Sequence, residues 1–176
     1  MKNFIYLDCD NLDDISNKID KFLTDRNLVT QHLNKISHVE LLKEVPELQD
    51  FINSFGLEVF QIFAVANSNI GHGGMHVDYI NDVRINFPVK NTKGTAPTVF
   101  YELENLEVTP DTTAEGYLYN KLKYTKSKII GFYMLDRPVV FNPKIPHELI
   151  MRKYLVDPRV ILSIYFTTNP THLLTT

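Results

Sequence analysis

Residues 83–89 read VRINFPV, and polar and apolar side chains alternate along this stretch. In an extended chain Arg84 and Asn86 would face one side, while Ile85 and Phe87 would face the other. Alternation with a period of two is typical of a β-strand whose faces meet different surroundings. The stretch therefore predicts a strand with one polar and one apolar face.

Similar stretches, rich in β-branched and aromatic residues, recur from residue 57 to the C-terminal region. The predicted strands span residues 57–66, 83–89, 98–103, 117–124, 129–134, 138–141 and 159–167. Turn-forming residues separate them, including Gly71–Gly74, Asn91–Gly94 and Thr109-Pro110-Asp111. Many short strands at this spacing predict a barrel or a sandwich.

The first 56 residues have a helical pattern instead, after a short predicted strand at residues 4–7. Asn11 or Asp13 would cap a first helix that ends near Arg26. Ser37 and Glu40 form a capping box at the start of a second helix. Pro46 suits the first turn of a renewed helix, and Gly56 suits its C-terminal end. We expect a single domain, in which a helical layer (residues 1–56) covers a β core (residues 57–176).

Composition excludes several classes of protein. The formal net charge of -3 gives no electrostatic reason to bind nucleic acid. No apolar run approaches the roughly 18 residues that a membrane-spanning helix needs. Cys9 is the only cysteine, which excludes a disulfide within one chain and a cysteine-ligated zinc site. A lone cysteine also fits an intracellular, cytoplasmic protein.

The segment His76-Val77-Asp78 follows a glycine-rich loop and places two metal-binding side chains two residues apart. In a strand both would point to the same side and could bind one metal ion. A histidine from a distant strand would complete the two-histidine, one-carboxylate set suited to non-haem Fe(II). By itself the motif also fits a surface histidine beside a solvated aspartate.

The candidate for that third ligand is His147. It follows a predicted strand, 138–141, and the turn residues Asn142-Pro143, so it would re-enter the sheet. Twelve residues later Arg159 begins an apolar strand. A guanidinium beside a metal pocket can bind a carboxylate through two parallel hydrogen bonds.

The order of these motifs resembles the 2-oxoglutarate/Fe(II)-dependent oxygenase superfamily, in its prolyl 4-hydroxylase-like and aspartyl/asparaginyl β-hydroxylase-like branches. The resemblance covers roughly residues 57–166. It implies a double-stranded β-helix, which is a jelly-roll, cupin-like barrel. It also implies that His76, Asp78 and His147 bind Fe(II).

The resemblance further implies that Arg159 binds the distal carboxylate of the co-substrate 2-oxoglutarate. Arg84 and Asn86 resemble positions that help to hold the co-substrate in the aspartyl-hydroxylase branch. Many members have Ser or Thr two residues after the arginine, where this chain has Ile161. Ser163 has the same strand parity but lies further along.

The implied function is that of a dioxygenase that uses O₂ to hydroxylate a peptide or amino-acid side chain, with release of succinate and CO₂. Two alternatives remain open. One is a cupin-like metalloprotein that does not use 2-oxoglutarate, in which Arg159 would have no carboxylate to bind. The other is an inactive barrel that acts as an interaction module.

The segment from Asn105 to Lys128 has no counterpart in the family pattern. It alternates lysine with tyrosine after a group of turn formers. One interpretation is an edge hairpin that lysines protect from further pairing. The other is a mobile flap that borders the active site and contributes to the choice of substrate.

Overall fold

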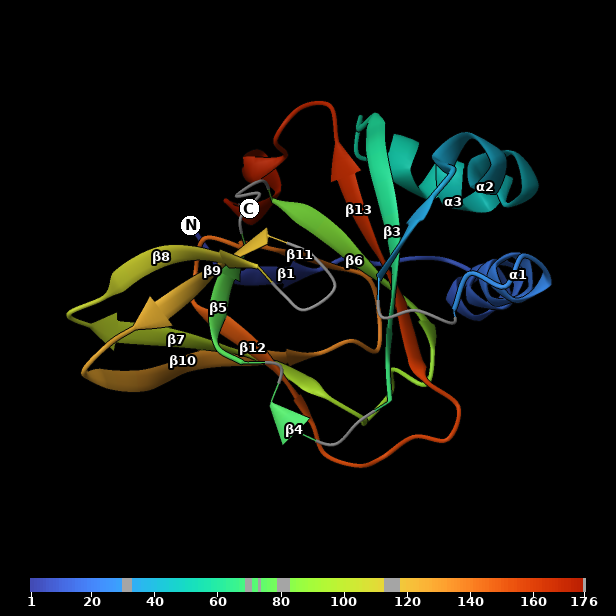
Figure 1. The fold of residues 1–176 in the computed structure, drawn as a ribbon. Helices are drawn as coiled ribbons and strands as arrows, with labels where there is room; N and C mark the ends of the chain where they lie inside the picture. Colours follow the sequence, from blue (N-terminus) through green and yellow to red (C-terminus); the bar gives the residue numbers. More distant parts are fainter. Residues whose placement is uncertain (30–32, 69–70, 73, 79–82, 113–117, 176) are drawn as a thin grey trace.

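The computed structural model describes residues 1–29, 33–68, 71–72, 74–78, 83–112 and 118–175. Its strands form two antiparallel sheets that face each other, and its helices lie beyond the first sheet (Figure 1). The predicted mostly β architecture with N-terminal helices is confirmed. The described pairings leave both sheets open at their edges rather than closing them into one barrel.

The order of strands brings distant parts of the sequence together. The first sheet runs β1 (Phe4–Tyr6), β11 (Val139–Phe141), β6 (Arg84–Lys90), β13 (Arg159–Phe166), β3 (Val59–Asn67) and β2 (Leu33–Ile36). The second runs β10 (Lys126–Met134), β7 (Pro97–Glu104), β12 (His147–Met151), β5 (His76–Asp78), β9 (Leu118–Lys123) and β8 (Glu107–Thr112), with β4 (Gly71–His72) paired to β12. The helical elements are α1 (Leu12–Asp25), α2 (His38–Glu44), α3 (Pro46–Asn53) and the 3₁₀ helix η1 (Thr171–Leu174).

The helices form where the sequence predicts them. Asn11 occupies the N-cap position of α1, and the Oγ of Ser37 accepts a hydrogen bond from the Glu40 amide at 3.5 Å. Pro46 occupies the first turn of α3, and Gly56, just beyond that helix, has a positive φ of 66°. Local hydrogen bonding and backbone preference therefore decide these boundaries. Every helix in the described ranges is too short or too polar to span a bilayer.

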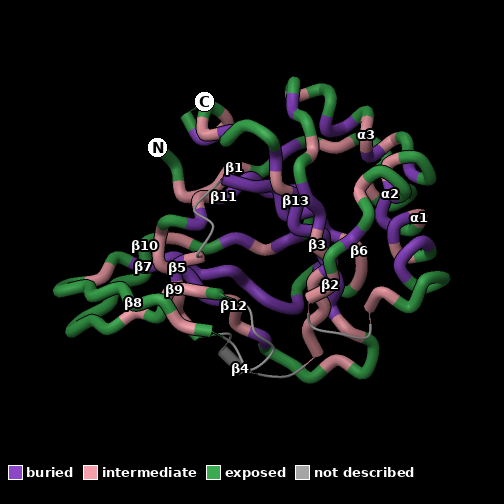
Figure 2. The backbone as a smooth tube through the Cα atoms, turned by 45° about the horizontal axis from the view of Figure 1, so that its top comes forward, coloured by how far each residue is buried: buried purple, intermediate pink, exposed green. Residues whose placement is uncertain are grey.

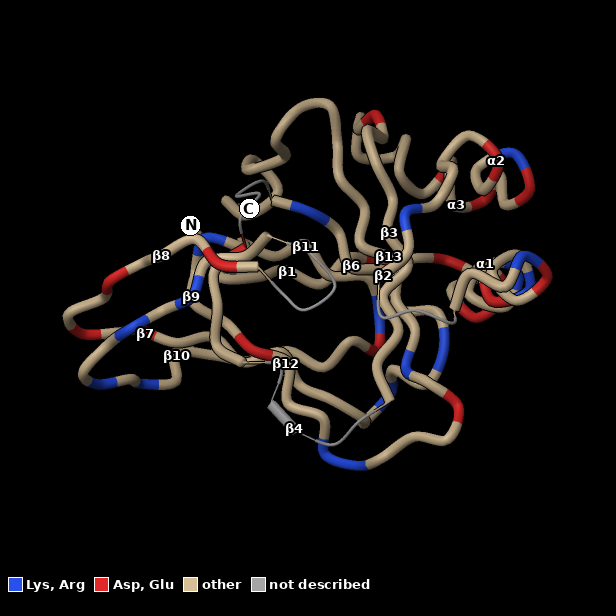
Figure 3. The backbone as a smooth tube through the Cα atoms, viewed as in Figure 1, with Lys and Arg blue, Asp and Glu red and all other residues tan. Residues whose placement is uncertain are grey.

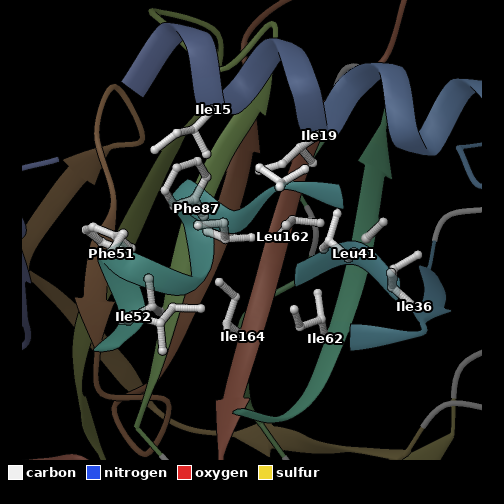
Figure 4. Close-up of a cluster of buried hydrophobic side chains, with 14 of the residues drawn as sticks. Ile15, Ile19, Ile36, Leu41, Phe51, Ile52, Ile62, Phe87, Leu162 and Ile164 are labelled. Carbon is white, nitrogen blue, oxygen red and sulfur yellow. The ribbon is translucent and has the colours of Figure 1, made fainter. Parts of the chain in front are cut away.

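One apolar cluster joins the helices to the outer face of the first sheet. Ile15 and Ile19 of α1 and Phe51 of α3 pack towards Leu162 and Ile164 of the central strand β13 (Figure 4). Buried residues are concentrated along β3, β6 and β13, whereas the ends of β8 and β10 are exposed (Figure 2). The helical layer thus keeps water from one face of the sheet.

Leu162 lies at the centre of this cluster and is 0% exposed. Replacing it by alanine is expected to lower the free energy of unfolding by about 2–5 kcal/mol, because the lost methyl groups leave a cavity between β13 and the helices. Urea denaturation measures this change. Val39→Ala serves as the control, since Val39 is 68% exposed on α2. Equal losses in the two variants would contradict the assignment of this core.

Successive residues of β13 point to opposite sides of the first sheet. Leu162 packs against the helices, whereas Ile161 belongs to a second cluster that lies between the two sheets. The regular pairing of β13 with β3 extends this alternation from Arg159 to Tyr165. Arg159, Ser163 and Tyr165 therefore share the inter-sheet side with Ile161.

Three details differ from the sequence prediction. Strand β2 lies within the first 56 residues, where the sequence predicts helices after residue 7, and it pairs with β3. Thr109-Pro110-Asp111 lies within strand β8 rather than in a turn. Pro110 is tolerated because β8 is an edge strand, which needs its amide groups on only one side. Gly71 and His72 of the predicted glycine loop form the short strand β4, whereas Gly73 lies outside the described residues.

Candidate metal centre

Three side chains from β5 and β12 converge on one point between the sheets. His76 and His147 are directly opposite each other on these paired strands, and Asp78 lies two residues further along β5. One donor atom from each residue lies within 4.8 Å of the other two. The Nε2 of His76 is 3.4 Å from Asp78 Oδ1, and the Nε2 of His147 is 3.5 Å from Asp78 Oδ2. The spacing fits a single cation bound between them.

Both imidazole rings are oriented by a backbone carbonyl two residues earlier. The Nδ1 of His76 donates to the oxygen of Gly74, and that of His147 donates to the oxygen of Ile145, each at 2.8 Å. A carbonyl can only accept, so each Nδ1 carries the proton. Each ring therefore directs its Nε2 atom towards Asp78, which is the orientation that metal-binding histidines adopt.

The surroundings also favour a neutral His147. Burial, opposed by the charge of Asp78, lowers the pKa of His147 to about 4. Burial acts in the same direction on His76, but the hydrogen bond to Asp78 and its negative charge outweigh it and raise the pKa of that ring.

Aromatic residues enclose His147. The ring centroids of Phe141 and Phe100 lie 5.4 Å and 6.1 Å from that of His147, which is 5% exposed. These rings exclude water from one side of the site. Low local polarity strengthens the interaction of the ligands with a cation.

Arg84 lies next to Asp78 and is paired with it. Its guanidinium forms an ion pair with Asp78 Oδ2 and donates a hydrogen bond to the hydroxyl of Tyr165. Burial lowers the pKa of Arg84 to about 10, so the side chain remains charged at neutral pH. Arg84 is thus a buried cation held against a proposed metal ligand.

Asn86 lies further along β6, on the same face as Arg84. Its Nδ2 donates to the hydroxyl of Tyr133 at 3.1 Å, whereas its buried Oδ1 has no hydrogen-bond partner. Ser163 is directly opposite Asn86 on β13. The space between the sheets therefore contains polar atoms that a bound molecule could satisfy.

Arg159 is the most deeply buried cation, with 2% of its surface exposed. Among the described residues, its Nε has no hydrogen-bond partner, and the same is true of the Nε of Arg84. Burial lowers the pKa of Arg159 to about 10, and Tyr133 opposes this effect. Burying an arginine in this way lowers the stability of the fold unless an anion pairs with the guanidinium.

Tyr133 and Tyr165 are site residues that the sequence did not indicate. Tyr133 is 1% exposed and contacts Asn86, while Tyr165 contacts Arg84. Their partners lie 47 and 81 residues away in the sequence, so no local pattern could relate them. The packing of the two sheets brings Tyr133 to Asn86, whereas the pairing of β13 with β6 brings Tyr165 to Arg84.

The segment 105–128 borders this centre. Strand β9 pairs with β5, so that Lys121 is opposite His76 and Tyr119 is opposite Asp78. Basic residues on β9 and β10 lie beside acidic residues of β7 and β8 (Figure 3), as in the ion pair of Lys123 with Glu107 at 3.1 Å. A hairpin next to the site agrees with the location expected of a flap. Its mobility stays a prediction, and residues 113–117 lie outside the described ranges.

Comparisons with known proteins give matches among solved structures alone, and three chains match there. Searches against protein-family models and curated proteins found no match. Among solved structures, the chain is similar to the crystal structure of a Pseudomonas putida prolyl-4-hydroxylase, with a TM-score of 0.42 and 13% sequence identity. The alignment covers 94% of this chain and 92% of that chain.

Proposed function

We propose that this chain is an Fe(II)- and 2-oxoglutarate-dependent oxygenase of the hydroxylase type. The observation that carries the proposal is the convergence of His76, Asp78 and His147, with both Nε2 atoms directed towards the carboxylate. Two imidazoles and one carboxylate on one side of a cation leave its other positions open, as non-haem iron oxygenases require. Bound iron and 2-oxoglutarate would supply, together with O₂, the oxidant for a substrate C–H bond.

The buried polar groups between the sheets support a dicarboxylate co-substrate. Arg159 would bind its distal carboxylate, because that guanidinium is enclosed and its Nε has no hydrogen-bond partner. Tyr133, whose hydroxyl accepts a hydrogen bond from Asn86 Nδ2, would donate from that hydroxyl into the same space. Phe100 and Phe141 would exclude water from the reacting centre.

The fold is part of the same proposal. We infer that the two facing sheets are those of a double-stranded β-helix, and that residues 1–56 and 57–176 form one domain. The proposed substrate is a peptide or amino-acid side chain. It would approach past the β8–β9 hairpin, where Lys121 and Tyr119 lie opposite the two ligands from β5.

The direct test is oxidation of 2-oxoglutarate by the iron-loaded protein. We expect slow formation of succinate without any added substrate and faster formation with the correct one. Asp78→Ala, which removes the only carboxylate of the proposed ligand set, should abolish both. Stoichiometric iron binding without succinate formation, across a screen of peptides and amino acids, would favour a cupin-like metalloprotein. Absence of metal binding would favour an interaction module.

A further inference from the structure

The two oxygens of Asp78 have different neighbours. Oδ1 lies 3.4 Å from the Nε2 of His76. Oδ2 lies 3.5 Å from the Nε2 of His147 and forms the ion pair with Arg84. The carboxylate is therefore shared between the proposed metal position and a buried cation.

Arg84 is held in place from several directions. Its guanidinium carbon lies 4.9 Å from the ring centroids of both Phe141 and Tyr165. The Tyr165 hydroxyl accepts a hydrogen bond from it, and the residue is 6% exposed. Strand pairing fixes its backbone, because Arg84 is opposite Phe141 on β11. Moving this side chain away from Asp78 would break cation–π contacts and leave a buried charge unpaired.

We propose that Arg84 is a positioning residue that reserves Oδ2 of Asp78, so that the carboxylate offers only Oδ1 to the metal. This inference rests on the metal site proposed above. It gives Arg84 a role different from the co-substrate contact that the sequence resemblance implies. A cation on Oδ2 prevents the carboxylate from turning to bind through both oxygens.

The consequence concerns how many positions stay open on the metal. In an octahedral site, two histidines and a one-oxygen carboxylate leave about three positions, whereas a carboxylate bound through both oxygens leaves about two. A chelating co-substrate and O₂ together need all three. Arg84 would thus preserve the position that O₂ requires without touching any reactant.

The test counts water molecules on bound Mn²⁺, and it needs no turnover. Water-proton relaxation and the broadening of the Mn²⁺ EPR signal by ¹⁷O-labelled water both report this number. We expect about three waters in the wild type and about two in Arg84→Met, because the freed Oδ2 then also binds the metal. Arg84→Lys should keep about three, since an ammonium can still donate to Oδ2.

Arg26→Met is the matched control. Arg26 also combines a cation–π contact, 3.9 Å above Phe22, with a carboxylate ion pair to Glu44, but it lies at the end of α1. The number of water molecules on Mn²⁺ in Arg26→Met should equal that in the wild type. Circular dichroism of each variant establishes that it is folded.

The possible failures are separable. A wild type that binds no Mn²⁺ overturns the proposed function itself. A wild type that binds Mn²⁺ with about two waters overturns the role of Arg84, even if Arg84→Met does not fold. About three waters in Arg84→Met, with weaker binding of 2-oxoglutarate, would overturn it as well and assign Arg84 to the co-substrate.

Discussion

Replacing His147 by glutamine is expected to weaken the binding of Fe²⁺, Mn²⁺ or Co²⁺ by about a hundredfold or more. The side chain is one of the three proposed metal ligands, and its ring is held by the hydrogen bond to Ile145. Loss of a partner that merely orients a ligand already costs about 10–100-fold in metal affinity, so loss of the ligand should cost at least as much. Isothermal titration under anaerobic conditions measures the change.

His172→Gln is the control for this experiment, because His172 is an exposed residue of η1. Its metal affinity should match that of the wild type. His76→Gln and Asp78→Asn should behave like His147→Gln, since the three side chains are proposed to act as one site. If His147→Gln alone retained the metal affinity of the wild type, the three side chains would not act as one metal site.

Replacing Arg159 by methionine is expected to weaken 2-oxoglutarate binding while leaving the metal site intact. A desolvated, bidentate contact with a carboxylate contributes on the order of 2–5 kcal/mol, which corresponds to roughly 30-fold to several-thousand-fold in affinity. The variant should be at least as stable as the wild type. Methionine fills a similar volume without a buried charge whose Nε has no hydrogen-bond partner.

Titration of 2-oxoglutarate into the Mn²⁺-loaded protein measures this effect, and titration of Mn²⁺ alone verifies that the metal still binds. Arg152→Met is the control, because Arg152 is exposed just after β12. Unchanged affinity for 2-oxoglutarate in Arg159→Met, together with normal binding of Mn²⁺, would leave the enclosed guanidinium without the proposed ligand.

Much of the local structure is determined by the sequence alone. The alternation in 83–89 predicts β6, and the spacing of apolar residues predicts α1 with Ile15 and Ile19 on its buried face. These patterns are readable because strand and helix geometry relate residues two, three or four positions apart. The same rule places His76 and Asp78 on one face of β5 before any tertiary structure is known.

Partners across the sheets were decided by the tertiary structure. The hydrogen bond of Arg84 to Tyr165 and the pairing of His76 with His147 depend on strand register. The contact of Arg84 with Asp78 depends on how the two sheets face each other. The assignment of His147 came from motif order, and its distance from His76 could not be read from periodicity. Strand periodicity determines which side a residue faces but not which strand lies beside it. That choice depends on how the whole chain buries its apolar surface and pairs its backbone hydrogen bonds.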